Sequence, residues 1–269
     1  MARKPRRLPL ERRILNVFPS RGTEGDWGID VAVASGAIRK VARLPREVDL
    51  REAWWGVGDQ GATGACVGWA ATDGVLRYHL VKARRLRKDQ RLSPRFTWMA
   101  SKETDGNTQR PETFIEKAGT SLKAALDVGR RYGSVLDSLL PFDVDHLMFT
   151  GDVDHFYAAA SQRKVAGYYN LGRSLRAWRT WLASHGPVVG AIGVDDSWHR
   201  AGRSKGRLDR FRPSSIEGGH AVCVVGYRAD GRFIVRNSWG RGWGDGGFAY
   251  ATDAWVRAAF LAESYGITV

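Results

Sequence analysis

The apolar residues of this 269-residue chain recur at a helical spacing through most of its first half. In residues 66–87 they return mostly every three or four positions, which predicts one long helix. Three further helices are predicted to begin after serines that can cap a helix N-terminus, namely Ser93, Ser121 and Ser174. Residues 152–162 carry another helical pattern. The first half of the chain is therefore predicted to be mainly helical, with one helix following later.

Short alternating or continuous apolar runs, the signal for strands, dominate the second half. Residues 164–169 alternate between apolar and polar side chains, and four runs of strand length follow. The predicted strands span residues 164–169, 188–194, 220–227, 232–238 and 246–251. Helices in one half of a chain and strands in the other are typical of α+β proteins, so this is the expected fold class.

The same patterns divide the chain into three regions. Residues 1–43 form a basic N-terminal extension in which Pro19 and several glycines interrupt any long helix. Residues 44–160 are predicted as a helical lobe, and residues 161–269 as a β-rich lobe with a long exposed loop over 195–217. We expect the extension to be partly ordered and to pack on the body of the protein. A short pro-segment is the alternative.

The charge of the chain leaves two interpretations open. The formal net charge is +14, and arginine dominates it, with basic clusters in residues 3–13 and 82–91. An acidic partner would fit this charge, and so would a dispersed, solvated surface. Neither cluster interleaves aromatic residues as a single-strand binder does, and no nucleic-acid fold motif is present. We therefore expect no nucleic-acid partner.

Composition and cysteine content bear on the compartment. At 43% hydrophobic and 26% charged residues, the chain has an ordinary globular composition. No run approaches the ~20 apolar residues of a membrane helix, and the N-terminus lacks the apolar core of a secretory signal. Only Cys66 and Cys223 are present, and Cys223 lies in an apolar run typical of a buried side chain. A disulfide-free protein fits a reducing compartment, so we predict a cytoplasmic location.

The candidate chemistry begins in a glycine-rich turn, residues 59–64, that leads into Cys66. A thiol at the start of a helix lies at the positive end of the helix dipole, which favours the nucleophilic thiolate. Gln60 can offer a side-chain N–H beside the same sulfur. A thiolate with a neutral donor nearby suits acyl transfer, in which negative charge develops on the attacked carbonyl oxygen.

Two distant motifs complete this pattern: Gly-Gly-His-Ala-Val around His220, and Val-Arg-Asn-Ser-Trp-Gly around Asn237. In their order and local motifs, these residues together with Gln60 and Cys66 resemble the papain-like cysteine peptidases. A Gly-Trp-Gly-Asp-Gly-Gly-Phe run after the second motif adds to the likeness. The resemblance covers roughly residues 44–250.

The resemblance implies a papain-like two-lobed fold, in which the active site lies in the cleft between a helical lobe and an antiparallel, β-barrel-like lobe. Cys66 would be the nucleophile, His220 the base, and Asn237 the residue that orients the imidazole. The Cys66 N–H and the Gln60 side chain would stabilise the oxyanion. Trp239 would shield the His–Asn hydrogen bond and border the substrate. The implied activity is that of a cysteine-type endopeptidase that forms a covalent thioester.

Further substrate-binding residues follow from the same resemblance. Gly119 and Thr120 would pair with the substrate backbone. The other candidates would line the pocket for the side chain one residue before the cleaved residue, or lie beside the histidine: Ser121, Leu122, Ala191, Gly219 and Ala221. None of them is charged, so burial favours an apolar substrate side chain there. We expect peptides with Leu, Val or Phe at that position to be cut best.

Three positions depart from the common pattern of the family. Thr63 stands in place of a frequent disulfide cysteine, Val67 in place of an aromatic residue, and Gly219 in place of a polar residue before the histidine. His220 and Asn237 also follow the cysteine at longer distances than the ~130–150 residues of the papain signature. Bacterial-type members of the family tolerate such departures, which bear more on the substrate than on the chemistry.

Two other classes of function are compatible with the sequence. One is a non-peptidase acyl transferase or amidase with related site chemistry, and the other is an inactive binding protein with a basic surface. No Cys/His grouping has zinc-ligand spacing and no glycine-rich phosphate loop is present, so no metal or cofactor is expected. The expected partner is a peptide or protein substrate, without a membrane, and the chain is expected to act as a monomer.

Overall fold

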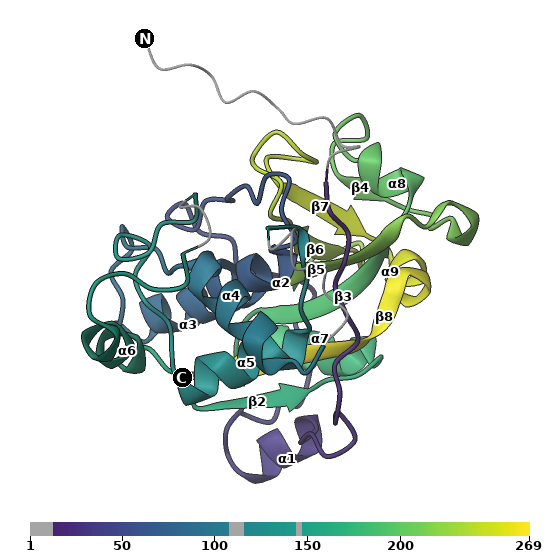
Figure 1. Cartoon of the computed structure of the whole chain (residues 1–269). Coiled ribbons are helices and arrows are strands. Elements are labelled where there is room, and N and C mark those ends of the chain that lie inside the picture. The colour runs from purple at the N-terminus through teal and green to yellow at the C-terminus, as the bar shows by residue number, and fades with distance from the viewer. Residues whose placement is uncertain (1–12, 108–115, 144–146) are drawn as a thin grey trace.

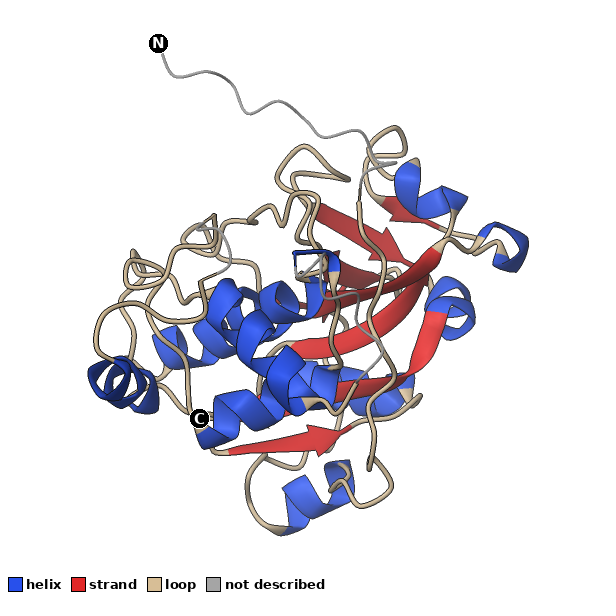
Figure 2. Ribbon diagram, in the orientation of Figure 1, coloured by secondary structure: helices blue, strands red, loops and turns tan. Residues whose placement is uncertain are grey.

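The computed structural model describes residues 13–107, 116–143 and 147–269. Several helices pack against one side of a mixed sheet, as Figure 1 and Figure 2 show. The strands follow the order β2-β8-β3-β5-β6-β7-β4, and β1 pairs with β5. Among the described strand pairs, only β4 and β7 are parallel. The structure confirms the predicted α+β class.

The described part of the chain contains these strands: β1 (Val48–Asp49), β2 (Gly167–Asn170), β3 (Val188–Val194), β4 (Arg207–Leu208), β5 (Gly218–Tyr227), β6 (Phe233–Arg236), β7 (Phe248–Ala251) and β8 (Phe260–Thr268). Its helices are α1 (Ile29–Ala34), α2 (Cys66–Gly68), the π-helix η2 (Trp69–Leu76), α3 (Arg77–Lys82), α4 (Pro94–Thr104), α5 (Leu122–Arg131), α6 (Val153–Ser161), α7 (Leu175–Ser184), α8 (Asp196–His199), the 3-10 turn η4 (Pro213–Ser215) and α9 (Asp253–Ala259). All five predicted strands are present within a few residues of their predicted bounds.

The central strands are apolar along their whole length because hydrophobic clusters cover both faces of the sheet. On β3, Val189 and Ala191 pack in the cluster that contains Cys66 and the helices α2, η2 and α5. Val188 and Ile192, which point the other way, pack in the cluster that contains α7 and α9. Successive residues of a strand point to opposite faces, so a strand buried on both faces reads as one continuous apolar run.

The prediction of one regular helix over residues 66–87 is wrong. The segment is α-helical only in α2 and α3, and the π-helix η2 lies between them. The wider turn places Gly74 so close to Cys223 that a Cβ on the glycine would lie 3.0 Å from the cysteine Cβ. The helix ends at Lys82, and Arg84, with φ of +59°, turns the chain away. Apolar spacing alone does not distinguish a π-helical turn from an α-helical one.

The exposed loop predicted over residues 195–217 is also wrong. The segment contains α8, β4 and η4, and Trp198 and Leu208 within it are fully buried. Asp195 is buried as well, and its carboxylate accepts hydrogen bonds from the backbone N–H groups of Ser197 and Arg212 at 3.1 and 2.6 Å. These elements are too short to show a periodic pattern, so the polar composition suggested a loop.

Three elements longer than five residues had no counterpart among the predictions. The helix α1 lies in the N-terminal extension, where Gly28 forms a bridge with Asn170 at the end of β2. The helix α9 leads into the strand β8, which inserts between β2 and β3. The last strand of the chain therefore lies next to a central strand of the sheet, where its side chains border the candidate site.

Candidate active site

Cys66 is the first residue of α2, and its side chain is fully buried against β5. Burial raises the pKa of the thiol to about 11, although the backbone N–H groups of Ala221, Val67 and Cys66 itself favour the thiolate. The sulfur therefore faces the expected donors at the start of a helix. In the absence of water these donors do not suffice to ionise it.

The histidine predicted to act as the base, His220, lies on β5, and its Nε2 is 2.7 Å from Oδ1 of Asn237. The same Oδ1 accepts a hydrogen bond from the backbone N–H of Ser238 at 2.8 Å, which fixes the orientation of the amide. A carbonyl oxygen can only accept, so Nε2 carries the imidazole proton and Nδ1 keeps its lone pair. Nδ1 is buried without a hydrogen-bond partner among the described residues.

The imidazole is neutral in this structure. Burial lowers the pKa of His220 to about 4, the hydrogen bond to Asn237 opposes that shift, and the guanidinium of Arg13 adds to it. The sulfur of Cys66 interacts with the backbone of Ala221, the next residue along β5, and makes no hydrogen bond to Nδ1. The structure thus holds a neutral thiol on α2, facing β5, and a neutral imidazole on β5, instead of the ion pair that the chemistry would require.

Gln60 is tied to the segment that carries Asn237. Its backbone N–H donates to the carbonyl of Ser238 at 2.8 Å, and its Oε1 accepts from the Ser238 hydroxyl at 2.7 Å. Its Nε2 donates to the carbonyl of Thr63 at 2.9 Å, inside the turn that leads to Cys66. Ser238 therefore fixes which end of the amide is the donor, and one N–H of that donor has no partner among the described residues. Sequence analysis did not find this role of Ser238.

Two tryptophans enclose the histidine. Trp239 is buried, and its ring centroid lies 5.2 Å from that of His220. Trp198 is fully buried, with its ring centroid 5.8 Å from the same imidazole. Their rings keep water from the His220–Asn237 hydrogen bond. Sequence analysis named Trp239 but missed Trp198, because the latter lies in the segment that was predicted to be an exposed loop.

Residues 13–20, which we call the strap, cross the site between the helices and the sheet; Figure 1 shows them in purple above α1. On the sheet side, the backbone N–H of Val17 donates to the carbonyl of Gly219 at 3.2 Å. On the helix side, the backbone N–H of Phe18 donates to the carbonyl of Thr120 at 3.1 Å. The strap is therefore bonded through its backbone to both halves of the molecule.

Side chains hold both ends of the strap. At its start, the Arg13 guanidinium donates to both carboxylate oxygens of Asp59 and lies 5.5 Å from the ring centroid of Trp239. At its end, the Ser20 hydroxyl accepts a hydrogen bond from the backbone N–H of Lys123 at 3.0 Å. The strap thus spans the site from the turn before Cys66 to the start of α5.

The strap approaches two glycines so closely that no other residue would fit there. A Cβ on Gly119 would collide with the carbonyl oxygen of Asn16, and a Cβ on Gly219 would lie 2.6 Å from a methyl carbon of Val17. Both glycines were predicted to bind substrate. The strap therefore lies on the surface predicted for the substrate, and its Val17 packs against the hydrophobic cluster that contains the fully buried Cys66.

The remaining predicted substrate residues fall into two groups. Ser121 borders the strap: it forms a bridge with Phe18 and caps α5, where its hydroxyl accepts from the N–H of Ala124 at 3.4 Å. Deeper in the molecule, three small or apolar residues pack in the same hydrophobic cluster as the nucleophile: Leu122, Ala191 and Ala221. A cavity of about 420 Å³ lies beside the strap and is lined in part by Phe18 and Ser121.

Among the described residues, no group of three or more His, Cys, Asp or Glu side chains is arranged to hold a metal ion. Across the same residues, no helix combines the length and the apolar character that crossing a membrane would require. Cys223 is a free, buried cysteine of β5 that pairs with Val189 on one side and Arg236 on the other.

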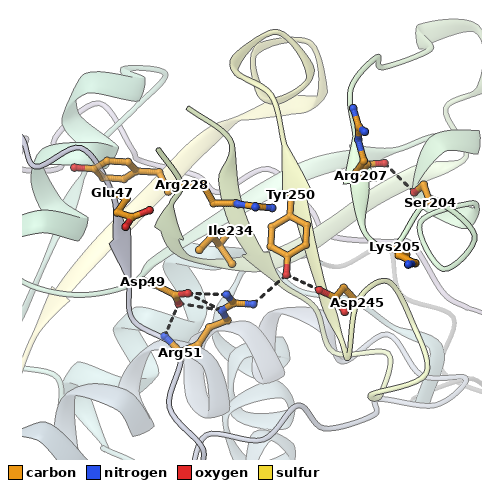
Figure 3. A pocket seen from close by; sticks show the side chains of 11 residues that line it. Glu47, Asp49, Arg51, Ser204, Lys205, Arg207, Arg228, Ile234, Asp245 and Tyr250 are labelled. Carbon is orange, nitrogen blue, oxygen red and sulfur yellow. Dashed lines mark hydrogen bonds and ion pairs between the residues drawn. The ribbon is translucent and has the colours of Figure 1, made fainter. Parts of the chain in front are cut away.

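A second cavity of about 470 Å³, drawn in Figure 3, contains none of the candidate catalytic residues. Four of its polar side chains are bonded to one another. Arg51 donates to both carboxylate oxygens of Asp49 and to the hydroxyl of Tyr250, which in turn donates to Asp245 at 2.6 Å. Because these groups are already paired, we assign no ligand to this cavity.

The class of protein is indicated by a thiol at the start of a helix that packs against the strand carrying an asparagine-bound imidazole. This is the arrangement of the cysteine hydrolases that use a Cys–His–Asn site. Residues 44–260 match the family model described as papain family cysteine protease. The chain belongs to this family, as its motifs predicted.

Individual relatives are more distant. Cathepsin F of Drosophila melanogaster is 26% identical over 246 residues, which make up 83% of this chain and 36% of cathepsin F. Cysteine proteinase B of Leishmania mexicana is 32% identical over 103 residues, or 37% of this chain and 22% of that protein. The chain therefore spans well under two thirds of the length of these relatives.

Solved structures support the fold over nearly the whole chain. Xylellain, a cysteine protease from Xylella fastidiosa, has a TM-score of 0.77 at 20% identity, covering 96% of this chain and 97% of xylellain. Digestive procathepsin L2 from Tenebrio molitor has a TM-score of 0.71 at 19% identity, covering 99% of this chain and 81% of that one. At such identities the likeness defines the fold alone.

Proposed function

We propose that this protein is a cysteine-type peptidase that hydrolyses peptide bonds through Cys66, His220 and Asn237. The observation that carries the proposal is the hydrogen bond from His220 Nε2 to Asn237, because it leaves the Nδ1 lone pair as the only base of the imidazole. A base whose tautomer is fixed by a third residue is what a nucleophilic thiol needs for activation.

The proposed reaction proceeds in two steps. Nδ1 of His220 takes the Cys66 proton, the sulfur attacks the peptide carbonyl carbon, and the oxyanion is stabilised by the Cys66 N–H and Gln60 Nε2. The imidazolium then gives its proton to the leaving amine, which breaks the C–N bond and leaves a thioester on the sulfur. Water, deprotonated by the same Nδ1, hydrolyses the thioester and restores the thiol.

The proposal includes a latent state. A substrate carbonyl cannot reach a sulfur that is fully buried, so the strap has to leave before the reaction begins. Opening would also let water reach His220 and remove the Arg13 charge that helps to keep the imidazole neutral. Several of the similar solved structures are titled as proenzymes, among them the Tenebrio molitor procathepsin L2 and the ragweed protease Amb a 11 in its proform, which supports this interpretation.

Labelling with an epoxide inhibitor of cysteine peptidases, followed by mass mapping of the labelled peptide, tests both the proposed nucleophile and the latent state. Val17→Pro removes the N–H that bonds to Gly219, and Val17→Ala is the matched control that keeps it. We expect Cys66 to be the labelled residue in every variant. Labelling should be roughly fivefold to tenfold faster in Val17→Pro than in Val17→Ala, the scale of one lost hydrogen bond.

The possible results separate the two parts. If the epoxide modifies Cys223 as readily as Cys66, or modifies neither, the proposed nucleophile is wrong. If Cys66 is labelled equally fast in both Val17 variants, the nucleophile stands and the latent state is wrong. Cleavage of a peptidoglycan amide in preference to peptides would favour the amidase alternative over a peptidase.

A further inference from the structure

The loop of residues 83–90, at the end of α3, gathers positive charge that the proposed reaction does not use. It lies at the opposite end of the helical segment from Cys66, and so away from the candidate active site (Figure 1). A cavity of about 370 Å³ opens at this loop. Its lining includes four cationic side chains, and none of the described residues that line it is acidic. The four cations are Arg84, Arg85, Arg87 and Lys88.

The backbone of this loop is held from beneath. The buried guanidinium of Arg77 donates to the carbonyls of Lys88 and Gln90 at 3.1 and 3.0 Å. Leu86 is a buried apolar anchor, and its backbone N–H donates to the carbonyl of Leu80 at 3.2 Å. The four cationic residues around this anchor are exposed. A ligand would therefore meet charges on a backbone that is already ordered, which lowers the entropy lost on binding.

The cations of the cavity are only partly neutralised within the described parts of the chain. Arg87 pairs with Asp89 at the surface, where such a pair is weak. Arg85 reaches only a carbonyl, that of Gln162 at the end of α6, at 3.4 Å. The side chain of Arg84 makes no hydrogen bond or ion pair with a described residue. Most of the positive charge here is therefore available to a ligand.

Two neighbouring carboxylates are already bound by other cations. Glu52, whose pKa the charge of Lys88 helps to lower, pairs with Lys82. Beneath the loop, the buried carboxylate of Asp73 accepts hydrogen bonds from three guanidinium groups, those of Arg77, Arg91 and Arg236. Neither acid is free to neutralise the cavity.

The backbone conformation at Arg84 is unfavourable for an arginine. Its φ is +59°, the left-handed conformation that the ends of helices commonly give to glycine. A side chain in this conformation is strained, because its Cβ lies close to its own backbone. The helix dipole favours cations in the last turn, but it would do so equally at unstrained positions. Termination of α3 alone therefore does not account for an arginine here.

We propose that the cavity at residues 83–90 binds a small anion that carries two or more linked phosphate groups. Guanidinium groups bind phosphate oxygens in pairs, and several of them around one cavity suit more than one phosphate. The site lies outside the catalytic residues and does not depend on the proposed peptidase chemistry.

Other anionic partners fit the cavity less well. The large apolar residues that line it, Val81 and Leu86, are buried, so the loop has none to insert into a lipid layer. No aromatic ring lines the cavity to stack on a nucleic-acid base. A stable protein interface takes roughly 20–30 residues on each side, which is far more than this loop provides.

Isothermal titration calorimetry of the full chain with inorganic tripolyphosphate, at fixed ionic strength, tests the inference. Tripolyphosphate should bind roughly tenfold or more tightly than inorganic phosphate, because it can contact several cations at once. Arg85→Gln and Lys88→Gln should each weaken its binding roughly threefold to tenfold, since these exposed contacts are screened by solvent. Equal affinities for the two anions, or an affinity that neither substitution changes, would overturn the inference.

Arg84→Gly distinguishes a binding role of this arginine from a structural one. The change removes one cation and relieves the strained backbone, so the free protein should keep or raise its thermal midpoint while its affinity for tripolyphosphate falls severalfold. The matched control is Lys205→Gly, because Lys205 is the other described residue that has a positive φ, +50°, without being glycine. It lies outside the loop and should leave the affinity unchanged.

Two results would contradict the proposal. If Arg84→Gly lowers the thermal midpoint and leaves the affinity unchanged, Arg84 serves only to end the helix. If Lys205→Gly weakens tripolyphosphate as much as Arg84→Gly does, the net charge of the protein governs binding and the cavity is not a site.

Discussion

Cys66 and Cys223 lie in the same hydrophobic cluster, one at the start of α2 and the other on β5, and both are free thiols. Neither is accessible, with exposed fractions of 0% and 1%. Burial raises the pKa of the first to about 11 and that of the second to about 12. By burial and by acidity, the two side chains are nearly equivalent in this structure.

What covers each sulfur distinguishes them. Cys223 is enclosed by the sheet and by the backbone of η2 at Gly74, parts of the core that cannot move without unfolding. Cys66 is enclosed in part by the strap, whose attachment through Val17 and Phe18 consists of a few hydrogen bonds. The Cys66 sulfur also faces several backbone N–H donors that lower its pKa. After burial, the pKa of Cys223 depends on two charges that oppose each other, those of Arg236 and Asp73. What distinguishes a reactive cysteine here is that the segment covering it can leave and that N–H donors already face its sulfur. Its burial in one structure does not reveal its reactivity.

The sharpest test of this comparison is to delete each sulfur in turn. Cys66→Ala should lose on the order of 10⁶-fold in kcat, the scale found when a nucleophile of a catalytic triad is removed. Cys223→Ala should keep its kcat and lose roughly 1 kcal/mol of unfolding free energy, because a buried atom is lost from a packed core. Peptide hydrolysis and urea denaturation measure the two effects. Similar turnover in both variants would remove the distinction altogether.

A smaller loss is expected from Gln60, which serves only the thiol that reacts. Gln60→Ala should lower kcat by roughly 10²- to 10³-fold, the effect of one oxyanion donor, while the rate of epoxide labelling at Cys66 changes little. Ser238→Ala frees the Gln60 amide to rotate. It should also lower kcat with little change in labelling, but by less than Gln60→Ala does. If labelling falls in step with kcat in Gln60→Ala, then Gln60 maintains the structure of the site and is not an oxyanion donor.

Acid should favour opening of the strap over Cys66 and leave the core around Cys223 folded. The pKa of His220 is about 4 beneath the strap, against 6.5 for an ordinary histidine, so the open state binds more protons between these values. The closed state is fully favoured above pH 6.5 and loses at most about 1.4 kcal/mol, or tenfold in population, per pH unit toward pH 4. Hydrogen exchange at the Val17 and Phe18 amides, corrected for intrinsic rates, measures the opening.

The core amides of β5 around Cys223 serve as the internal control for that experiment, because they report global unfolding. They should stay protected over the range in which the strap amides become labile. In His220→Gln the opening of the strap by acid should disappear, because the other titrating group beneath the strap, Glu263, has a pKa raised by burial and its protonation favours the closed state. Strap amides that are equally protected at pH 7 and pH 5 would show that the charge state of His220 does not govern opening.

The smallest effect concerns reduction. No disulfide links the two cysteines, so the thermal midpoint should be the same with and without dithiothreitol. Activity should nevertheless require the reductant, because a thiolate at Cys66 that becomes accessible is prone to oxidation, whereas Cys223 stays protected. Differential scanning calorimetry in both conditions makes the comparison. A drop in the midpoint on reduction would mean that Cys66 and Cys223 form a disulfide, which the proposed function does not allow.

Much of the candidate site could be predicted because its chemistry lies in short local motifs. The turn before Cys66 and the runs around His220 and Asn237 each carry their own signature, and the family match agrees with them. The regular strands could also be predicted, since burial on both faces leaves an apolar run. The π-helical turn in η2 and the short elements between residues 195 and 217 could not, because they have no periodicity of their own. The cytoplasmic location and the monomeric state stay predictions.

The sequence by itself determined the family, the α+β class and the identities of the residues proposed to react. Only the tertiary structure decided that the strap lies on the residues predicted to bind substrate, and that Ser20 in the strap is bonded to the buried Glu263. Both facts depend on contacts between segments far apart in the chain, such as Val17 with Gly219 and Ser20 with Glu263. At Val17 and Phe18 the strap is bonded through its backbone, which every residue provides, and the burial of a glutamate is set by its neighbours in space. Neither leaves a pattern in the order of the amino acids.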